Sequence, residues 1–393
     1  MLKVTTERLY YHDAYLTEFE AQVIELSPDG RSVYLDRTAF YPSSGGQPYD
    51  LGWLDGQEVI EVADEEDRIA HLTSGPVPLG PVKGKIQWPR RYEHMQQHTG
   101  QHLLSAVLME LFGFPTLSFH LGEESSTIEL GTKEISEKQI DEAEARANEL
   151  ARTGTEVRIA FEDAERVEGL RKQSQRPGTL RIIEIDGVDK SACGGTHVRR
   201  LAEILPLQTR KQEKVRGNVR LEFVCGWRAI RRAKQDFRVV QDLARQSASA
   251  IDKLPEYLAA QKQRLAEAEK ERQRLAESLA RREGEEAYLA TQPSAGGVRR
   301  ALWEVEQISE TVRAKALAYA AGGQSLVLVL GKQPAGVLIA CSPDAGIDAG
   351  SVLKQTLGEF GGRGGGSSTL GQGSVPDAAC ARALAGKLGM NQT

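Results

Sequence analysis

Cysteine is scarce in this sequence, and long apolar runs are absent. The 393 residues include only four cysteines, at positions 193, 225, 341 and 380, with no closely spaced pair. A secreted domain held together by disulfides needs a denser set of cysteines, so that class of protein is disfavoured and a reducing compartment is expected. No apolar stretch approaches the roughly 18 residues of a membrane helix, and residues 1–7 lack the apolar segment of a signal peptide. We therefore expect a cytoplasmic protein without membrane contact.

An excess of positive charge is also missing. Lys and Arg number 50 against 55 Asp and Glu, a net charge of −5, so any contact with nucleic acid must use a local basic patch. Between Arg199 and Arg238, twelve residues are Lys or Arg and only four are Asp or Glu. Lys214, Arg216 and Arg220 lie here on a predicted pair of strands. They either neutralise phosphates of a bound nucleic acid or form a solvated surface.

Two pairs of potential metal ligands stand out against this background. His98 and His102 lie four residues apart on a predicted helix over residues 89–112, and this spacing places them on the same face. Further along the chain, Cys193 and His197 flank a Gly-Gly turn. Three imidazoles and one thiolate are a donor set that suits zinc. We therefore predict one Zn²⁺ per chain, bound by these four residues.

The residue after the first histidine limits the reaction. In metalloproteases of the zincin type, a glutamate directly follows the first histidine and acts as the general base. Thr99 occupies that position here, so peptide hydrolysis by that mechanism is disfavoured. His94 lies four residues before His98, but each step of four rotates roughly 40° around a helix. We expect His94 to support the ligands or lie at the surface rather than bind the metal.

The pattern of apolar residues in the first 235 positions predicts an α+β fold. Residues 1–88 show short alternating strands with hairpin turns at 27–30 and 55–56, which is typical of a small β-barrel. Residues 89–235 combine the histidine helix with further predicted elements into an α+β metal domain. These elements are strands within 117–130, 157–161 and 179–185 and a helix over 135–152.

The sequence of the remaining residues predicts a helical linker and a small α/β domain. Residues 236–291 carry apolar side chains at helical 3-4 spacing, with an interruption at 252–255 caused by a proline. They form either an intermolecular coiled coil, and hence a homodimer, or an antiparallel hairpin that packs on itself. Residues 292–393 contain the continuous apolar runs 326–330 and 337–341, typical of strands buried on both faces.

Two glycine-rich segments are expected to form loops. Residues 38–48 contain Gly45 and Gly46, and residues 360–368 contain Arg363 between glycines. Such a segment either serves only as a flexible turn or exposes backbone N–H groups that hold a phosphate or a ribose. The second segment is predicted as a loop between a helix and the end of its domain, with Arg363 facing an RNA backbone.

Taken together, the motifs resemble a known family. Residues 98–104 and 193–197 resemble the editing domain of alanyl-tRNA synthetase and its free-standing relatives, the AlaX trans-editing proteins. Residues 38–48 resemble the glycine-rich motif of the same family, and residues 292–393 resemble the DHH-associated C-terminal domain of the synthetase. The chain is thus similar to a long-form AlaX protein. The Asp-His-His motif of DHH phosphoesterases is absent from the sequence, so their chemistry is not implied.

This resemblance implies a zinc-dependent hydrolase that removes wrong amino acids from tRNA(Ala), chiefly serine, with glycine as a second candidate. The ATP-binding half of the synthetase has no counterpart in the sequence, so no aminoacylation is expected. A site that hydrogen-bonds the serine hydroxyl would discriminate against alanine. The candidate substrate contacts are Gln101, Ser118, His120 and Thr196. The candidate tRNA contacts are Gly45, Gly46, Lys214, Arg216, Arg220 and Arg363.

Three alternatives stay open at this point. Four protein ligands are typical of structural zinc, whereas catalytic zinc keeps one position open. The main alternative is therefore a non-catalytic tRNA-binding protein with a structural zinc. The others are an editor of the threonyl-tRNA type and a general metal-dependent esterase that acts on small esters. No residue stands out as a general base.

Overall fold

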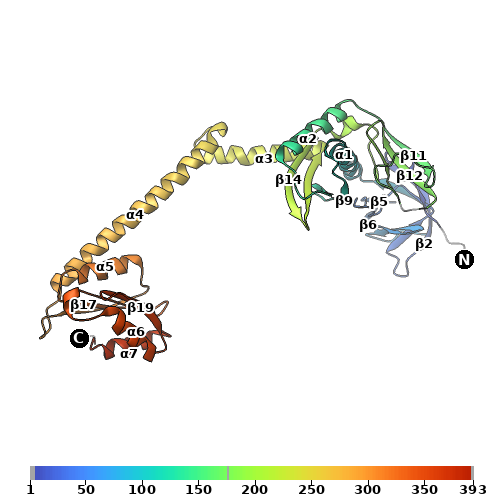
Figure 1. The fold of residues 1–393 in the computed structure, drawn as a ribbon. Coiled ribbons are helices and arrows are strands. Elements are labelled where there is room, and N and C mark those ends of the chain that lie inside the picture. The colour runs from blue at the N-terminus through green and yellow to red at the C-terminus, as the bar shows by residue number, and fades with distance from the viewer. Residues whose placement is uncertain (1–4, 175–176, 391–393) are drawn as a thin grey trace. The chain divides into compact units, whose positions relative to one another are not determined.

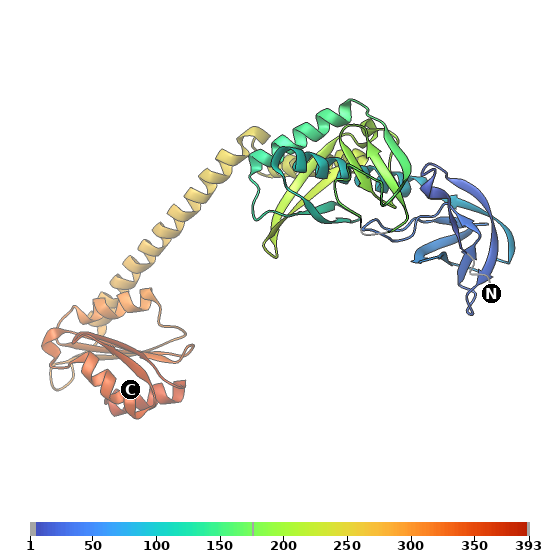
Figure 2. The ribbon, with the colours of Figure 1, turned by 45° about the vertical axis from the view of Figure 1, so that its right-hand side comes forward.

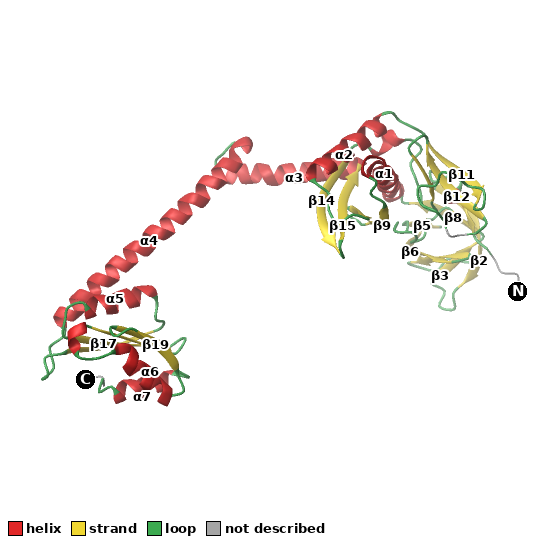
Figure 3. Ribbon diagram, in the orientation of Figure 1, coloured by secondary structure: helices red, strands yellow, loops and turns green. Residues whose placement is uncertain are grey.

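The computed structural model describes residues 5–174 and 177–390 and shows an α+β fold (Figure 1). The chain separates into two compact units, residues 1–242 and 243–393. Both units contain helices and strands (Figure 3). Among the described residues, no helix has the length and apolar character required to cross a membrane. The first unit holds both halves of the predicted metal site.

The N-terminal part of the first unit is a closed barrel with the strand order β2-β3-β7-β6-β5-β8. Asp55 and Gly56 form the turn between β5 and β6. Their φ values of 44° and 83° are both positive, as this turn type requires. Leu35, Phe40 and Leu54 are fully buried in the barrel interior. The barrel strands are β2 (Glu18–Leu26), β3 (Ser32–Leu35), β5 (Gly52–Leu54), β6 (Gln57–Glu65), β7 (Arg68–Thr73) and β8 (Gly80–Ile86). A separate parallel pair consists of β1 (Glu7–Arg8) and β4 (Arg37–Thr38).

One imidazole is buried inside this apolar barrel. His71 on β7 is fully buried, and its Nε2 lies 2.8 Å from the hydroxyl of Thr38. The Thr38 oxygen accepts the N–H of Phe40 (3.1 Å) and donates its own proton to Nε2, while Nδ1–H donates to the carbonyl of Val33 (3.0 Å). Burial lowers the pKa of His71 to about 4. The ring is therefore neutral, with both nitrogens hydrogen-bonded.

We expect His71 to make the protein less stable in mild acid. Because its pKa in the folded protein lies below the ordinary value of 6.5, the unfolded chain binds the proton more tightly, and stability falls as the pH drops from about 6.5 to about 4. The shift corresponds to roughly 3 kcal/mol. The substitution His71→Gln, which cannot ionise, should remove this part of the pH dependence in urea titrations, whereas the exposed His12→Gln should retain it. Identical pH dependence in wild type and His71→Gln would contradict this expectation.

The helix α1 (Trp88–Phe112) forms the centre of the rest of the first unit. Pro89 suits its first turn, where a backbone N–H has no helical partner, and Gly113 ends it in a left-handed conformation with φ 67°. Leu103 and Leu104 are fully buried, and so are many polar side chains of the helix. The helix packs between two sheets (Figures 1 and 2). Each buried polar side chain on it therefore needs a partner inside the protein.

The two sheets have the strand orders β14-β15-β10-β9 and β11-β12-β13. Arg216 and Gly217, with φ values of 51° and 87°, form the turn of the β14–β15 hairpin, which is the predicted basic strand pair. The helix α2 (Glu137–Arg152) packs beside α1, and α3 (Gly226–Gln246) directly follows β15. The strands are β9 (Thr116–Leu121), β10 (Ser126–Leu130), β11 (Val157–Asp163), β12 (Thr179–Ile185), β13 (Asp189–Ala192), β14 (Leu207–Val215) and β15 (Asn218–Cys225).

The second unit contains the long helix α4 (Leu254–Ala290). The helical segment is interrupted, as predicted, but the break covers residues 247–253 and so begins earlier than predicted. Pro255 lies instead in the first turn of α4, where its missing N–H removes no helical hydrogen bond. Leu258 and Leu265 are 57% and 62% exposed on α4. The homodimer through this segment stays a prediction.

The rest of the second unit is built on a five-stranded sheet with the order β16-β17-β18-β20-β19. Strands β17 and β18 are buried along their whole length, as their continuous apolar sequences predicted. The strands are β16 (Arg299–Val305), β17 (Ser325–Gly331), β18 (Gly336–Cys341), β19 (Arg363–Gly366) and β20 (Leu370–Ser374). The helices are α5 (Glu310–Ala320), α6 (Ala349–Glu359) and α7 (Ala378–Lys387).

The prediction of a loop over residues 360–368 is wrong. Arg363–Gly366 form β19, which pairs with β20 at the edge of the sheet. Close packing requires the glycines, since a Cβ on Gly364 would lie only 2.5 Å from the Cα of Gly373, and one on Gly366 would overlap the backbone of Leu370. Glycine runs normally disfavour strands, so the sequence pattern does not reveal this one. The side chain of Arg363 is exposed, and its contact with tRNA stays a prediction.

Candidate metal centre

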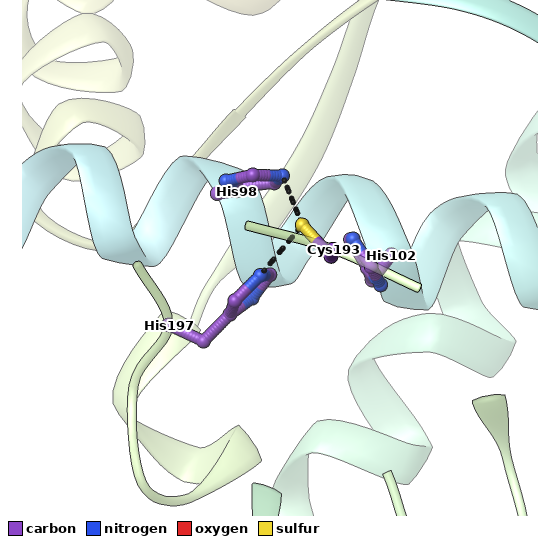
Figure 4. Close-up of side chains that lie close together, drawn as sticks. All are labelled: His98, His102, Cys193 and His197. Atoms are coloured by element: carbon purple, nitrogen blue, oxygen red, sulfur yellow. Dashed lines mark hydrogen bonds between the residues drawn. The ribbon is translucent and has the colours of Figure 1, made fainter. Parts of the chain in front are cut away.

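Two separate segments supply the four predicted ligands. His98 and His102 lie one turn apart on α1, whereas Cys193 and His197 lie in the loop that follows β13. Figure 4 shows the four side chains converging on one point. Their ligand atoms all lie within 4.8 Å of one another. The structure therefore brings together the four residues that the sequence singled out.

The spacing and chemistry of this cluster fit a zinc ion. The Sγ atom of Cys193 lies 3.5 Å from Nε2 of His98 and 3.4 Å from Nε2 of His197 (Figure 4). A tetrahedral zinc with Zn–N near 2.0–2.1 Å and Zn–S near 2.3 Å separates its donors by roughly 3.5 Å. Imidazole and thiolate donors also match the preference of zinc. These residues fit the metal that the sequence predicts.

Each imidazole of the cluster is held at its other ring nitrogen. A side-chain oxygen within hydrogen-bond distance of Nδ1 fixes the ring so that Nε2 turns toward the metal position. The pairs are His98 with Gln47 Oε1 (2.8 Å), His102 with Asp189 Oδ2 (2.9 Å) and His197 with Thr99 Oγ1 (3.2 Å). The three ligands are thus oriented by the protein itself. None of these supporting roles was predicted from the sequence.

Gln47 connects the glycine-rich segment to the metal loop. Its Oε1 also accepts the backbone N–H of Thr196 (3.1 Å), and its Nε2 donates to the Thr196 hydroxyl (2.8 Å). The neighbouring Gly46 has φ 85°, and a Cβ on it would lie 2.9 Å from the backbone oxygen of Phe119. Only glycine fits there. Through Gln47, this segment therefore fixes the ring of His98 and the loop at Thr196.

The charges of the cluster favour a cation. Burial alone would raise the pKa of the Cys193 thiol, but the three imidazoles hold it well below its ordinary value. Burial also disfavours a charge on His102, yet Asp189 and the Cys193 thiolate raise its pKa to about 9. The thiolate of the half-buried Cys193 lies near the buried carboxylate of Asp189, which is also paired with Arg171. A divalent cation would take the place of the proton on His102 as the charge that balances the thiolate.

We expect Asp189→Asn to weaken zinc binding about 10- to 100-fold. The Asp189 side chain is fully buried and also accepts Nε–H of Arg171 (2.6 Å), so its carboxylate is fixed in place. An amide of the same shape removes the charge that polarises the ring of His102. Competition with a chromogenic chelator measures the affinity, and Asp186→Asn, an exposed carboxylate in the preceding turn, is the matched control. Equal affinities in the two variants would exclude this role for Asp189.

A cavity of about 760 Å³ lies beside His98 and Cys193. Such a volume suits a small molecule or the end of a larger one. Nη1 of Arg181 donates to the carbonyls of Cys193 (2.7 Å) and Gly195 (2.9 Å), so this arginine also fixes the metal loop. No motif marks these wall residues in the sequence, so they were not predicted. Aromatic and cationic side chains on the wall are Arg8, Tyr10, Tyr11, Tyr41, Phe119, Phe161 and Arg181.

The predicted substrate contacts lie in different places. Gln101 is buried, with Nε2 hydrogen-bonded within α1 and Oε1 without a partner among the described residues. Ser118 and His120 are exposed on β9, and Phe119 between them packs its ring 5.3 Å from that of His98. Because side chains alternate along a strand, Ser118 and His120 point away from the cluster. The structure does not bring these two residues to the metal centre.

The predicted tRNA contacts are distributed over several elements. Gly45 borders the cavity beside the metal centre. Lys214 and Arg216 are exposed on the β14–β15 hairpin. Arg220 is 38% exposed and lies 3.3 Å from a carboxylate oxygen of Glu213. The roles of these residues in RNA binding stay predictions.

Known proteins resemble the whole chain and its metal loop. Residues 180–222 match the family described as the threonyl and alanyl tRNA synthetase second additional domain. The chain is 30% identical to the alanyl-tRNA editing protein AlaX-L of Pyrococcus horikoshii, over 94% of each chain. It is 33% identical to the alanyl-tRNA editing protein Aarsd1-B of Xenopus laevis, over 62% of this chain and 66% of that protein.

A synthetase is similar over the same length. The chain is 33% identical to the alanine–tRNA ligase of Korarchaeum cryptofilum over 94% of its own length, but it spans only 43% of that ligase. Among solved structures, the C-Ala domain of Aquifex aeolicus alanyl-tRNA synthetase covers 24% of the chain at 20% identity. Its TM-score of 0.20 is too low to assign a fold.

Proposed function

Since this chain belongs to the AlaX-L family of alanyl-tRNA editing proteins, we propose that it is a zinc-dependent hydrolase of mischarged tRNA(Ala). The reaction is cleavage of the ester between the amino acid and the terminal adenosine. Ser-tRNA(Ala) is the main proposed substrate and Gly-tRNA(Ala) the second, and aminoacylation is not part of the activity. The observation that carries the proposal is the four-residue cluster, two members of which, His98 and Cys193, line a cavity of about 760 Å³.

The residues around the cluster supply binding and orientation. When bound by the four ligands, zinc would supply a Lewis acid beside an ester that is already activated. Tyr11 and Phe161 offer aromatic faces for a nucleoside. Arg181 is 7% exposed, and its Nη2 has no hydrogen-bond partner among the described residues, which supports a role in holding an oxygen of the substrate. Gln101 and Thr196 are proposed to help select the amino acid.

The same proposal assigns the tRNA to surfaces on both units. The division into residues 1–88, 89–235, 236–291 and 292–393 is proposed to separate the barrel, the zinc-dependent editing domain, the helical linker and the DHH-associated C-terminal domain. A cytoplasmic location and a homodimer through α4 or the C-terminal domain belong to the proposal. The proposed contacts to tRNA(Ala) are Gly45, Gly46, Lys214, Arg216, Arg220 and Arg363.

Deacylation of purified Ser-tRNA(Ala) and Ala-tRNA(Ala) tests the function. Zinc-loaded protein should release serine much faster than alanine, because alanine lacks the hydroxyl that the site would bind. Ser-tRNA(Thr) serves as the control for an editor of the threonyl type. If tRNA(Ala) binds but neither ester is cleaved, the protein is a tRNA-binding protein with a structural zinc. Cleavage of p-nitrophenyl acetate without cleavage of either aminoacyl-tRNA would identify a general esterase.

A further inference from the structure

A second cavity, of about 590 Å³, lies at the first turns of α1 and shares no lining residue with the cavity at the metal centre. Three segments build it, residues 87–96, the turn at Glu123 between β9 and β10, and the first turns of α3 at residues 227–231. Its side chains are mainly aromatic, charged and amide groups. The proposed function gives none of these residues a role.

The pocket presents an aromatic surface to solvent. Trp227, in the first turn of α3, is 63% exposed. Trp88 and Tyr92 lie on α1 with their ring centroids 5.2 Å apart. Gly226, with φ 59°, allows α3 to begin here, because the side chain of Gln96 fills the space where a Cβ would stand. The exposed ring of Trp227 offers a flat face for stacking.

The pocket also carries a small excess of positive charge. Arg228 is anchored, since its Nε donates to Glu93 (2.8 Å) and its Nη1 to a backbone carbonyl (2.8 Å). Arg231 lies 2.6 Å from the same Glu93 oxygen, but its side chain is 57% exposed. Arg90 adds a third cation and Glu123 a second carboxylate to the lining. The carboxylate of Glu93 thus pairs with two guanidinium groups, and Arg231 has further N–H groups that can donate to an anion.

A buried nitrogen without a partner belongs to the same pocket. His94 is 3% exposed and lines the cavity, and its Nδ1 has no hydrogen-bond partner among the described residues. Burial and the nearby Arg90 and Arg228 lower the pKa of His94 to about 3, so the ring is neutral. Buried nitrogens of this kind are normally hydrogen-bonded in proteins. The atom therefore indicates where a polar group of a ligand would bind.

We propose that this pocket binds an unpaired nucleotide of the RNA substrate. Its base stacks on Trp227, the edge of the base hydrogen-bonds to His94, and an adjacent phosphate lies beside Arg231. Stacking, a polar contact to the base edge and a cation for the phosphate are how proteins hold single-stranded nucleotides. The inference rests on the proposed function, which names the RNA. His94 lies one helical turn before the ligand His98 on α1, so pocket and metal centre share one rigid element.

Binding of uncharged tRNA(Ala) to the full chain tests the pocket. Trp227→Ala should raise Kd roughly tenfold, as expected for the loss of one stacked base, whereas Trp227→Phe should stay close to wild type because it keeps an aromatic face. Arg231→Gln should reduce the slope of log Kd against log salt by about one. Two exposed residues of α3 outside the pocket give matched controls, Phe237→Ala and Arg232→Gln.

Affinity for tRNA(Ala) that is unchanged in both Trp227→Ala and Arg231→Gln would overturn the proposal. Titration with AMP, CMP, GMP and UMP distinguishes a pocket for a free mononucleotide from a pocket for a nucleotide of tRNA. If only mononucleotide binding depends on Trp227, the pocket serves a free nucleotide and the RNA assignment is wrong. If mononucleotides bind weakly and tRNA binding depends on Trp227, the assignment holds.

Deacylation of Ser-tRNA(Ala), measured on the same samples, separates this inference from the proposed function. Wild-type protein that binds tRNA through Trp227 but cleaves no ester would refute the editing function and support the pocket. Wild-type protein that cleaves the ester, with both Trp227→Ala and Arg231→Gln binding tRNA as tightly, would support editing and refute the pocket.

Discussion

Replacing His102 by alanine should lower the single-turnover rate of Ser-tRNA(Ala) deacylation by roughly 100-fold or more, since a bound metal contributes several kcal/mol to such reactions. The substitution removes one of four donors that lie within 4.8 Å of one another. It also leaves the buried carboxylate of Asp189 without its imidazole partner. Both effects weaken the site, so zinc content should fall well below one ion per chain.

Metal analysis and deacylation are measured on the same samples, with circular dichroism as the test of folding. Wild-type protein stripped of metal by a chelator is the matched control, because it keeps every side chain. Added zinc should restore deacylation in the stripped wild type and not in His102→Ala. A folded variant that holds stoichiometric zinc and deacylates at the wild-type rate would contradict the proposed ligand set. Unfolding of both the variant and the stripped wild type would indicate a structural zinc.

The four residues of the cluster could be predicted from the sequence because each half of the cluster is local. A helix places His98 beside His102, and a short turn places Cys193 beside His197. The supporting residues could not be predicted in the same way. Gln47 reaches His98 across 51 positions and Asp189 reaches His102 across 87, so only the tertiary packing of the barrel and the β12–β13 strands against α1 creates these contacts.

A second feature that the sequence does not predict is which face of a strand points toward the metal centre. The sequence Leu117-Ser118-Phe119-His120-Leu121 alternates polar and apolar residues, and this pattern correctly predicts a strand. It does not say which face the metal centre occupies. In the structure the apolar Phe119 packs against the ring of His98, while Ser118 and His120 are exposed. A polar pair near a reactive site is an attractive candidate for substrate contact, yet the pairing of β9 with β10 fixes the opposite orientation.

The sequence also does not predict whether a glycine-rich segment forms a loop or a strand. The segment with Gly45 and Gly46 was correctly predicted as a loop, whereas Arg363–Gly366 form an edge strand. What distinguishes them is the backbone conformation, since Gly45 and Gly46 have positive φ values of 53° and 85°, whereas Gly364 and Gly366 do not. Gly366 and Gly364 lie against the backbone of the adjacent strand, with no room for a side chain. A glycine in the sequence shows that a side chain is missing, but it does not show which neighbouring atoms leave no room for one.

Gly195→Ala should disable the metal centre almost as completely as the loss of a ligand. A methyl group at Gly195 would overlap the imidazole of His98 and lie 3.0 Å from the Oε1 of Gln47. The ring cannot move aside freely, because Gln47 holds its Nδ1 and the cluster holds its Nε2. A displacement of about 1 Å in such a site can cost roughly 100-fold in rate. Zinc affinity should fall together with deacylation.

The adjacent Gly194→Ala is the control that isolates this contact. Neither glycine is among the positive-φ residues of the chain, so the backbone accepts alanine at both positions. They differ in the space available, since a Cβ on Gly194 would lie 3.4 Å from the hydroxyl of Tyr11, close to an ordinary contact. Zinc affinity should therefore stay near wild type in Gly194→Ala and fall in Gly195→Ala. Equal affinities would mean that the loop can shift away from α1, and the tight approach of Gly195 to His98 would then not be required for metal binding.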